Sequence, residues 1–248
     1  MISIFRKKDF LIDHLEGIID IHNHILPGID DGAQNVEESI GLLEKFRDLG
    51  ITKFIATPHI MNDYYPNTPE TINSALTLLK KEISENKSLK NTEIRFAAEY
   101  MMDQNFLELM KTEKLLTLKD NMVLVEMSYF QAPINLNEIL FKLQTNGYKP
   151  VLAHPERYAF YHTKDLSKYE ELKNRGCLFQ LNTLSLTPHY GSNMQKIAYK
   201  LLENGMIDFI GSDTHRLQHL EKIETITIQK KTKDSITNII SKTKERFL

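Results

Sequence analysis

Residues 18–33 read IIDIHNHILPGIDDGA, and this stretch sets the pattern for the rest of the chain. Its start, IIDI, is rich in β-branched residues and predicts a short strand. His22 and His24 follow two residues apart, so on an extended segment their side chains face the same way. The loop after them contains Asp30 and Asp31, and either carboxylate could fold back toward the two imidazoles. The stretch therefore predicts a strand that ends at a metal-binding site.

Six similar runs of β-rich apolar residues follow, separated by amphipathic segments of helical periodicity. Helix starts are indicated by Asn35 with Glu38 three residues later, and by Pro69 directly after Thr68. The glycines that end helical segments are Gly50, Gly147, Gly176 and Gly205. The seven expected strands are residues 18–21, 53–56, 94–98, 123–125, 150–153, 178–181 and 207–210. Seven such βα units predict parallel strands, either in an open doubly wound sheet or in a closed barrel.

Side chains that can bind metal stand directly after most of these strands. In parallel βα folds the carboxyl ends of the strands carry the chemistry. The residues concerned are His22, His24, His59, Glu99, Glu126, His154, Asp213 and His215, with Asp30 or Asp31 as a further carboxylate. Imidazoles and carboxylates without a thiolate suit borderline or hard divalent ions. One tetrahedral zinc ion needs four ligands, so this many donors indicate a site with more than one ion.

A multinuclear site of this kind favours a phosphate ester as substrate, because its oxygens can bridge two ions. Arg157 lies three residues after His154, where its guanidinium group could hold phosphoryl oxygens. Arg216 is a weaker second candidate for the same role. Phosphatase chemistry based on a cysteine is excluded, because the residue six positions after the lone Cys177 is Thr183 rather than Arg.

The composition of the 248 residues is that of a folded globular protein. Thirty-one Lys and Arg against 33 Asp and Glu give a net charge of −2, so no basic field exists to hold a nucleic acid. One Cys cannot form an intramolecular disulfide, and no apolar run approaches about 18 residues. We therefore expect a cytoplasmic protein with no nucleic-acid partner and no stable membrane insertion.

Taken together, the motifs resemble the polymerase and histidinol phosphatase (PHP) superfamily. Within it they are similar to the manganese-dependent tyrosine-protein phosphatases of bacterial capsule and exopolysaccharide loci. The segments that carry the resemblance are residues 20–33, Thr57-Pro58-His59, Ala98-Glu99-Tyr100, His154-Pro155-Glu156-Arg157 and Ser212-Asp213-Thr214-His215. The resemblance implies an α/β fold, a distorted (β/α)7 TIM-like barrel (the PHP fold) in a single domain over residues 18–248. Residues 1–17 would form an N-terminal extension packed on the barrel.

The resemblance also implies three divalent metal ions, with Mn²⁺ expected and Fe, Zn, Co or Mg as alternatives. The first ion would be held by His22, His24, Glu99 and Asp213, the second by Glu99 as a bridge, Glu126 and His154, and the third by Asp31, His59 and His215. Arg157 matches the phosphate-binding arginine of the family. A second family arginine is expected a few residues beyond His215, where this chain reads LQHLE. Either Arg216 replaces it or that contact is missing.

The implied activity is hydrolysis of phosphotyrosine on protein by direct attack of a metal-bridging hydroxide. The implied partner is the phosphorylated tail of a bacterial tyrosine kinase that controls capsule or exopolysaccharide synthesis. Two alternatives stay open. One is another phosphoesterase of the same superfamily, acting on histidinol phosphate or on a nucleotide or oligonucleotide. The other is a metal-stabilised module that binds the kinase tail without hydrolysing it.

Overall fold

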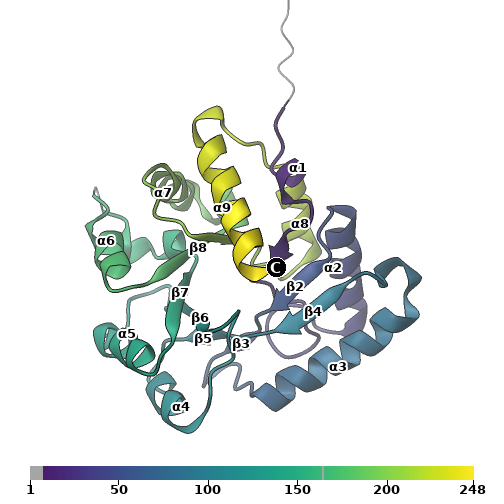
Figure 1. Ribbon diagram of the computed structural model, residues 1–248, viewed down its shortest axis with the longest axis horizontal. Helices are drawn as coiled ribbons and strands as arrows, with labels where there is room; N and C mark the ends of the chain where they lie inside the picture. Colours follow the sequence, from purple (N-terminus) through teal and green to yellow (C-terminus); the bar gives the residue numbers. More distant parts are fainter. Residues whose placement is uncertain (1–7, 164) are drawn as a thin grey trace, which may run out of the picture.

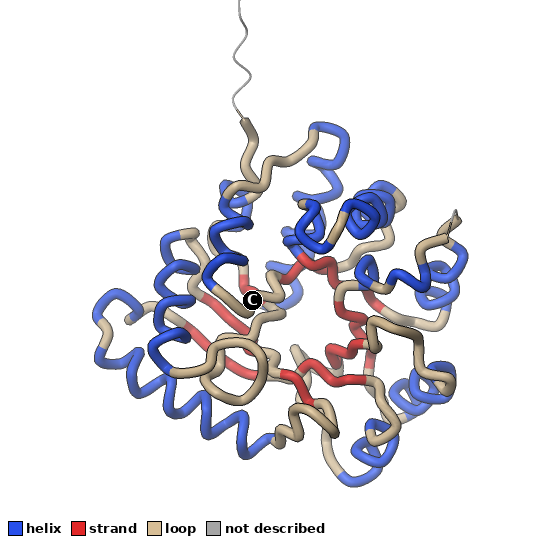
Figure 2. Tube along the Cα trace, turned by 180° about the vertical axis from the view of Figure 1, so that it is seen from behind, coloured by secondary structure: helices blue, strands red, loops and turns tan. Residues whose placement is uncertain are grey.

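The computed structural model describes residues 8–163 and 165–248. Strands and helices alternate along the chain, with the strands in the middle and the helices around them (Figures 1 and 2). The strands are β1 (Ile19–Asp20), β2 (Lys53–Ala56), β3 (His59–Ile60), β4 (Glu93–Phe96), β5 (Glu99–Met101), β6 (Met122–Glu126), β7 (Lys149–Ala153), β8 (Leu178–Asn182) and β9 (Phe209–Gly211). The α-helices are α1 (Ile12–Leu15), α2 (Val36–Asp48), α3 (Pro69–Glu85), α4 (Phe106–Thr112), α5 (Leu136–Thr145), α6 (Ser167–Asn174), α7 (Ser192–Glu203), α8 (Leu217–Glu224) and α9 (Lys233–Phe247). The predicted α/β fold with parallel strands is confirmed.

The strands form a three-stranded sheet in the order β1-β2-β4 and a six-stranded sheet in the order β3-β5-β6-β7-β8-β9. This division arises because β2 and β3 are separated by Thr57-Pro58, and β4 and β5 by Ala97-Ala98. Pro58 has no N–H group to donate to the ladder, which accounts for the first break. The expectation of one strand over 94–98 is therefore wrong in its last two residues, and the short strands β3 and β5 were not predicted.

Backbone hydrogen bonds also bring the carboxyl ends of β1 and β9 together. The N–H of Asp213 donates to the carbonyl of His22 (2.7 Å), and the N–H of His24 donates to the carbonyl of Thr214 (3.0 Å). The segment that contains the two histidines is therefore fixed beside the residues that follow the last strand. Two motifs about 190 residues apart in sequence meet through this contact.

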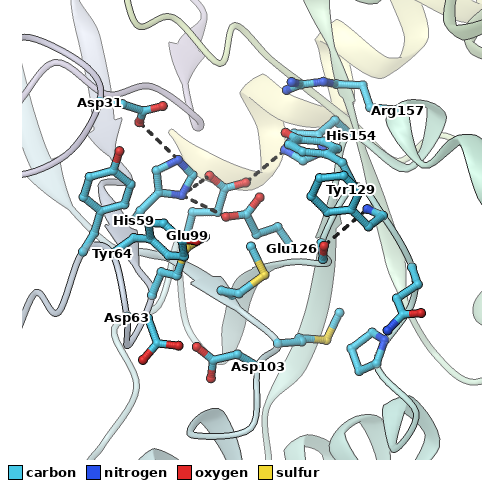
Figure 3. Close-up of a pocket in the computed structure, with 18 of the residues that line it drawn as sticks. Asp31, His59, Asp63, Tyr64, Glu99, Asp103, Glu126, Tyr129, His154 and Arg157 are labelled. Atoms are coloured by element: carbon cyan, nitrogen blue, oxygen red, sulfur yellow. Dashed lines mark hydrogen bonds and ion pairs between the residues drawn. The ribbon is translucent and has the colours of Figure 1, made fainter.

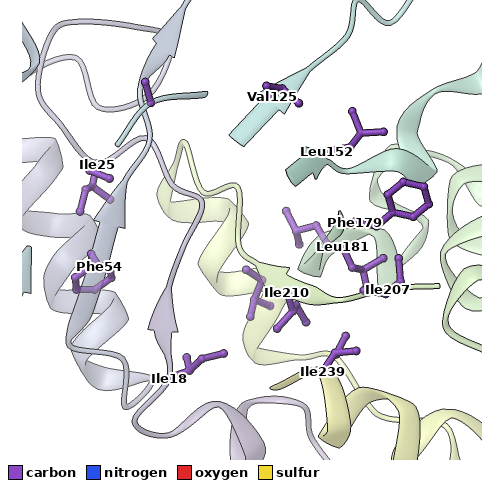
Figure 4. Packing of buried hydrophobic residues seen from close by; sticks show 14 of the residues in the cluster. Ile18, Ile25, Phe54, Val125, Leu152, Phe179, Leu181, Ile207, Ile210 and Ile239 are labelled. Carbon is purple, nitrogen blue, oxygen red and sulfur yellow. The ribbon is translucent and has the colours of Figure 1, made fainter. Parts of the chain in front are cut away.

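Alternate residues of the strands pack into two buried clusters, one on each face. On β6, Val123 and Val125 belong to a large cluster that includes the buried faces of the helices, whereas Met122 and Leu124 belong to a smaller one. Figure 4 shows part of the large cluster, including Val125. Strands that are buried on both faces have nearly continuous apolar sequences, which is why these runs can be recognised without a structure.

The helix boundaries follow the predicted signals. The side chain of Asn35 accepts the N–H of Glu38 (2.9 Å) before α2, and that of Thr68 accepts the N–H of Thr71 (3.3 Å) before α3. The carboxylate of Glu38 accepts the N–H of Gln34 (3.0 Å) rather than that of Asn35, so the capping box at α2 is shifted by one residue. The four predicted glycines follow α2, α5, α6 and α7, and each has a positive φ.

The described part of the expected N-terminal extension contacts the far end of the chain. Leu11 and Leu15 are buried, and the N–H of Leu11 donates to the carbonyl of Ile226 (2.9 Å). Residues 1–7 of that extension lie outside the described residues. Within residues 8–163 and 165–248, none of the helices combines the length and the apolar character that a membrane span requires.

Candidate metal centre

The nine side chains predicted to bind metal come together at the carboxyl ends of the strands. His22 and His24 are buried, and the others line a cavity of about 1090 Å³. These others are Asp31, His59, Glu99, Glu126, His154, Asp213 and His215. Figure 3 shows several of them converging from opposite walls of the cavity. The structure thus brings the whole predicted set together, and the role of each residue as a ligand stays a prediction.

The deepest part of the centre contains two imidazoles and two carboxylates. The Nε2 atoms of His22 and His24 are 3.4 Å apart. Glu99 Oε2 lies 3.2 and 3.5 Å from these two nitrogens, and Asp213 Oδ1 lies 3.3 and 3.4 Å from them. Four ligand atoms at about 2.1 Å from one divalent ion are about 3.4 Å apart in a tetrahedron. Each of the two carboxylate oxygens, taken with the two nitrogens, therefore has the spacing of ligands that share one ion.

His59 links this inner group to the outer carboxylates. Its Nδ1 lies 2.9 Å from Glu126 Oε1 and 3.2 Å from Glu99 Oε2, while its Nε2 lies 3.4 Å from Asp31 Oδ1. His154 reaches Glu99 from the other side, with 3.1 Å between Nε2 and Oε1. The further groups of possible ligands are His24, Asp31, His59 and His215; His59, Glu99 and Glu126; and His22, His154 and Asp213. Both His59 and His154 thus lie close to Glu99. The resemblance implied that His154, but not His59, shares an ion with Glu99.

The chemistry of the donor atoms fits divalent cations. The atoms that are buried without a hydrogen-bond partner among the described residues include His59 Nδ1, Glu99 Oε2, Glu126 Oε1 and His154 Nδ1. A buried polar atom without a partner is costly, and such atoms in native structures call for an explanation. Three of these four atoms point into the groups described above, so cations between them would satisfy them. The residues present therefore fit a metal centre.

Hydrogen bonds behind the imidazoles fix which nitrogen faces the centre. His22 Nδ1 lies 2.7 Å from Gln180 Oε1, His24 Nδ1 lies 2.7 Å from Asp30 Oδ2, and His215 Nδ1 lies 3.0 Å from the carbonyl of Asp213. Such contacts hold a ligating histidine in the correct tautomer and orientation. Sequence reasoning left Asp30 and Asp31 as alternatives. In the structure Asp30 supports His24, and the half-exposed Asp31 faces His59 and His215.

Gln180 was missed in the sequence, because it lies inside the apolar run of β8 rather than after it. It is fully buried, and it is a polar residue among apolar neighbours, which is the signal that could have identified it. We expect Gln180→Leu to lower metal affinity about 10- to 100-fold by releasing the ring of His22. Competition against a fluorescent chelator measures this affinity. Gln144→Leu, on the exposed side of α5, is the control, and equal affinity in both variants would contradict the supporting role.

The close approach of the backbone at two glycines shapes the floor of the centre. A Cβ atom on Gly32 would lie 2.1 Å from the carbonyl oxygen of His24, and one on Gly211 would lie 2.8 Å from the Cβ of His22. Both distances are shorter than van der Waals contact, so any larger residue would displace a histidine. Asp213 and His154 themselves have φ angles of 51° and 35°, which is uncommon outside glycine and typical of functional sites.

Carboxylates and imidazoles in the centre shift each other's pKa values. Burial raises the pKa of Asp213, but the positive charges of His22 and Arg157 outweigh burial and hold that pKa well below its ordinary value. Burial lowers the pKa of His24, but the neighbouring Asp30 raises it well above its ordinary value. Cations that bind here therefore displace protons from histidines, so their affinity increases with pH.

Arg157 joins the centre through Asp213. It belongs to the short 3-10 helix η2 (Pro155–Arg157), and its Nη1 donates to Asp213 Oδ2 (2.6 Å) while Oδ1 of the same carboxylate faces the inner histidines. Its guanidinium carbon lies 4.7 Å from the centre of the Tyr129 ring and 4.0 Å from that of Tyr190. Asn182 Nδ2 donates to Asp213 Oδ2 as well (2.7 Å). Cation–π contacts and a shared carboxylate thus hold Arg157 at the edge of the metal centre.

Arg216 occupies a different position. It lines the same cavity directly before α8, and its guanidinium group forms no hydrogen bond or ion pair with another described residue. The structure therefore places both predicted arginines at the cavity, with Arg157 held in place and Arg216 at the wall near His215. The aromatic residues Tyr129 and Tyr190, which contact Arg157, were missed because nothing in their local sequence marks them.

Several known proteins are similar to this chain in sequence and in fold. CapC of Staphylococcus aureus is 32% identical over 201 residues, which cover 81% of this chain and 78% of CapC. The tyrosine-protein phosphatase YwqE of Bacillus subtilis is 32% identical over 206 residues, which cover 81% of this chain and 78% of YwqE. A chain from the crystal structures of YwqE and of CpsB from Streptococcus pneumoniae, described as metal-dependent tyrosine phosphatases, has a TM-score of 0.74 at 29% identity, covering 83% of this chain and 84% of that chain. Residues 18–248 match the family described as capsular polysaccharide synthesis, CpsB/CapC, and the chain belongs to that family.

Proposed function

We propose that this protein is a metal-dependent phosphatase that removes phosphate from tyrosine in proteins. The observation that carries the proposal is the position of Asp213, which has one oxygen in the inner ligand group and the other on Arg157. A phosphoryl group held by Arg157 is therefore adjacent to the place where cations would bind. The names of the relatives, which are tyrosine-protein phosphatases, support the substrate class.

Each part of the chain has a distinct task in this proposal. The nine predicted ligands would hold the cations, which we propose are three in number and Mn²⁺ in the cell. When bound, such ions supply a hydroxide nucleophile at neutral pH and neutralise phosphoryl oxygens. Arg157 orients the phosphoryl group and stabilises the charge that develops on it in the transition state. A phenol leaves more readily than an alkyl alcohol because its pKa is about 10, so a dedicated general acid matters less for phosphotyrosine than for phosphoserine.

We further propose that the strands form a distorted (β/α)7 barrel over residues 18–248, with the described residues 8–17 as part of an N-terminal extension on it. The hydrogen bonds between the segments after β1 and β9 support closure at the carboxyl ends. A closed ring explains how side chains from so many strand ends share one cavity.

The proposed partner is the phosphorylated tail of a bacterial tyrosine kinase that controls capsule synthesis, and the proposed location is the cytoplasm, where such a tail is accessible.

A cysteine-dependent mechanism is not available to this chain. Cys177 is buried, and burial raises the pKa of its thiol to about 12, so the nucleophilic thiolate is absent at neutral pH.

A panel of three substrates tests the proposed reaction. A phosphotyrosine peptide, histidinol phosphate and a short single-stranded DNA are each incubated with the fully metallated protein. We expect hydrolysis of the phosphotyrosine peptide at a kcat/KM at least about tenfold above the other two, because the relatives are named tyrosine-protein phosphatases. Preference for histidinol phosphate or DNA would assign a different phosphoesterase. Binding of the peptide without turnover would instead indicate a binding module.

A further inference from the structure

The loop over residues 128–135, between β6 and α5, exposes large apolar side chains at the rim of the cavity. Phe130 is 93% exposed and Ile134 is fully exposed, although both line the cavity wall. Apolar groups in this position leave a large hydrophobic surface in water, and contiguous surfaces of this kind mark binding sites. The rim of the cavity is therefore suited to bind an apolar part of a ligand.

This loop is continuous with the proposed reaction centre through Tyr129. The ring of Tyr129 lies 5.8 Å from that of His154, and Arg157 lies over its face at 4.7 Å. Figure 3 shows Tyr129 beside His154 and Arg157, on the opposite wall of the cavity from Tyr64. Phe130 and Ile134, which follow Tyr129 in the chain, line the same cavity as Arg157, so they are available to the residues beside a phosphotyrosine whose phosphate binds there.

The cavity has room for more than one side chain. Pockets of about 300–1,000 Å³ hold a whole drug-sized molecule, and this cavity measures about 1090 Å³. Consecutive residues of an extended peptide are about 3.3 Å apart, so a residue next to phosphotyrosine stays within the same cavity. The space beyond the metal centre can thus receive the neighbours of the phosphorylated residue.

Local hydrogen bonds constrain the backbone of the loop. The N–H of Phe130 donates to Ser128 Oγ (3.3 Å), and the N–H of Leu136 donates to the carbonyl of Pro133 (3.1 Å). Pro133 also restricts the backbone before α5. Such constraints on the backbone that carries Phe130 and Ile134 reduce the entropy that is lost when a ligand binds.

We propose that Phe130 and Ile134 form a peptide subsite, which binds an apolar side chain one or two residues away from the phosphotyrosine of the substrate protein. This inference rests on the proposed function and adds a sequence preference to it. Phosphate and ring are recognised inside the cavity, and the apolar neighbour is recognised at its rim.

Single variants Phe130→Ser and Ile134→Ser test the subsite with three substrates. These are a phosphotyrosine peptide with leucine on both sides, the same peptide with serine in place of leucine, and p-nitrophenyl phosphate, which has no peptide part. We expect each variant to lose about tenfold in kcat/KM on the leucine peptide through a higher KM, a loss of about 1.4 kcal/mol. Activity on p-nitrophenyl phosphate and on the serine peptide should change less than about twofold. Phe141→Ser, which makes the same substitution at an exposed phenylalanine on α5, is the matched control.

Three results would overturn the subsite. Equal losses on all three substrates would show that the loop acts on the metal centre, and unchanged kinetics on the leucine peptide would show that the rim binds nothing. A concentration-dependent dimer that is lost in both variants, measured by sedimentation, would make the patch a contact between copies of this chain. Failure of the proposed function is distinct from these, because the fully metallated unmodified protein would then hydrolyse neither phosphotyrosine peptide, whatever its activity on p-nitrophenyl phosphate.

Discussion

Replacing Glu99 by Gln is expected to abolish phosphatase activity and to remove most of the bound metal. Glu99 Oε2 lies within 3.5 Å of nitrogens of His22, His24 and His59, and Oε1 lies 3.1 Å from His154. An amide keeps the shape of the side chain but removes its negative charge and one of its acceptor oxygens. Because this carboxylate lies beside four of the histidines predicted to bind metal, we expect a loss in kcat of at least about 1,000-fold.

Elemental analysis of the purified variant, together with hydrolysis of a phosphotyrosine peptide, measures both effects. Glu93→Gln is the control, because Glu93 stands on the exposed start of β4 away from the cavity. Thermal unfolding of both variants establishes that they are folded. Full metal content in a folded Glu99→Gln variant would contradict a central role for this carboxylate.

Arg157→Ala and His154→Ala are expected to have similar effects on activity and different effects on metal. The guanidinium group of Arg157 contacts Asp213 Oδ2, which Asn182 also holds, so the ligand position of Asp213 survives the loss of Arg157. We expect Arg157→Ala to lower kcat/KM about 100- to 1,000-fold with unchanged metal content. His154→Ala should lose activity and metal together, since its Nε2 lies against Glu99.

The same elemental analysis and peptide assay separate the two variants, with Arg175→Ala, at the exposed residue directly after α6, as the control for loss of an arginine. Arg216→Ala shows whether the second arginine contributes to phosphate binding, as the resemblance leaves open. Equal loss of metal in Arg157→Ala and His154→Ala would show that Arg157 supports the ligands rather than the substrate.

The parts of the fold that could be predicted from the sequence are those that depend on local residue patterns. Buried parallel strands have continuous apolar runs, so most strands were found close to their limits, and helix ends were marked by Asn35, Thr68 and four glycines. Eight of the nine possible ligands were found because they closely follow those runs, whereas Asp31 was distinguished from Asp30 only by the family resemblance. The breaks at Thr57-Pro58 and Ala97-Ala98 were not found, because they depend on which neighbouring strand each segment pairs with.

Residues that act through long-range contacts were also missed. Gln180 reaches His22 across 158 residues, and Tyr190 packs under Arg157 from a segment that no metal-ligand pattern marks. Phe130 and Ile134 are residue types that are usually buried in the core, and only the structure shows that they are exposed. In each case the partner is determined by the tertiary fold rather than by spacing along the chain.

We propose that these nine side chains hold divalent cations on which the reaction depends. Complete removal of metal by a chelator, followed by addition of Mn²⁺ and by parallel measurement of bound metal and phosphotyrosine hydrolysis, tests it most directly. We predict that activity disappears on chelation and returns in step with the metal that rebinds. Undiminished hydrolysis by protein shown to be free of metal would show that the reaction does not depend on bound cations.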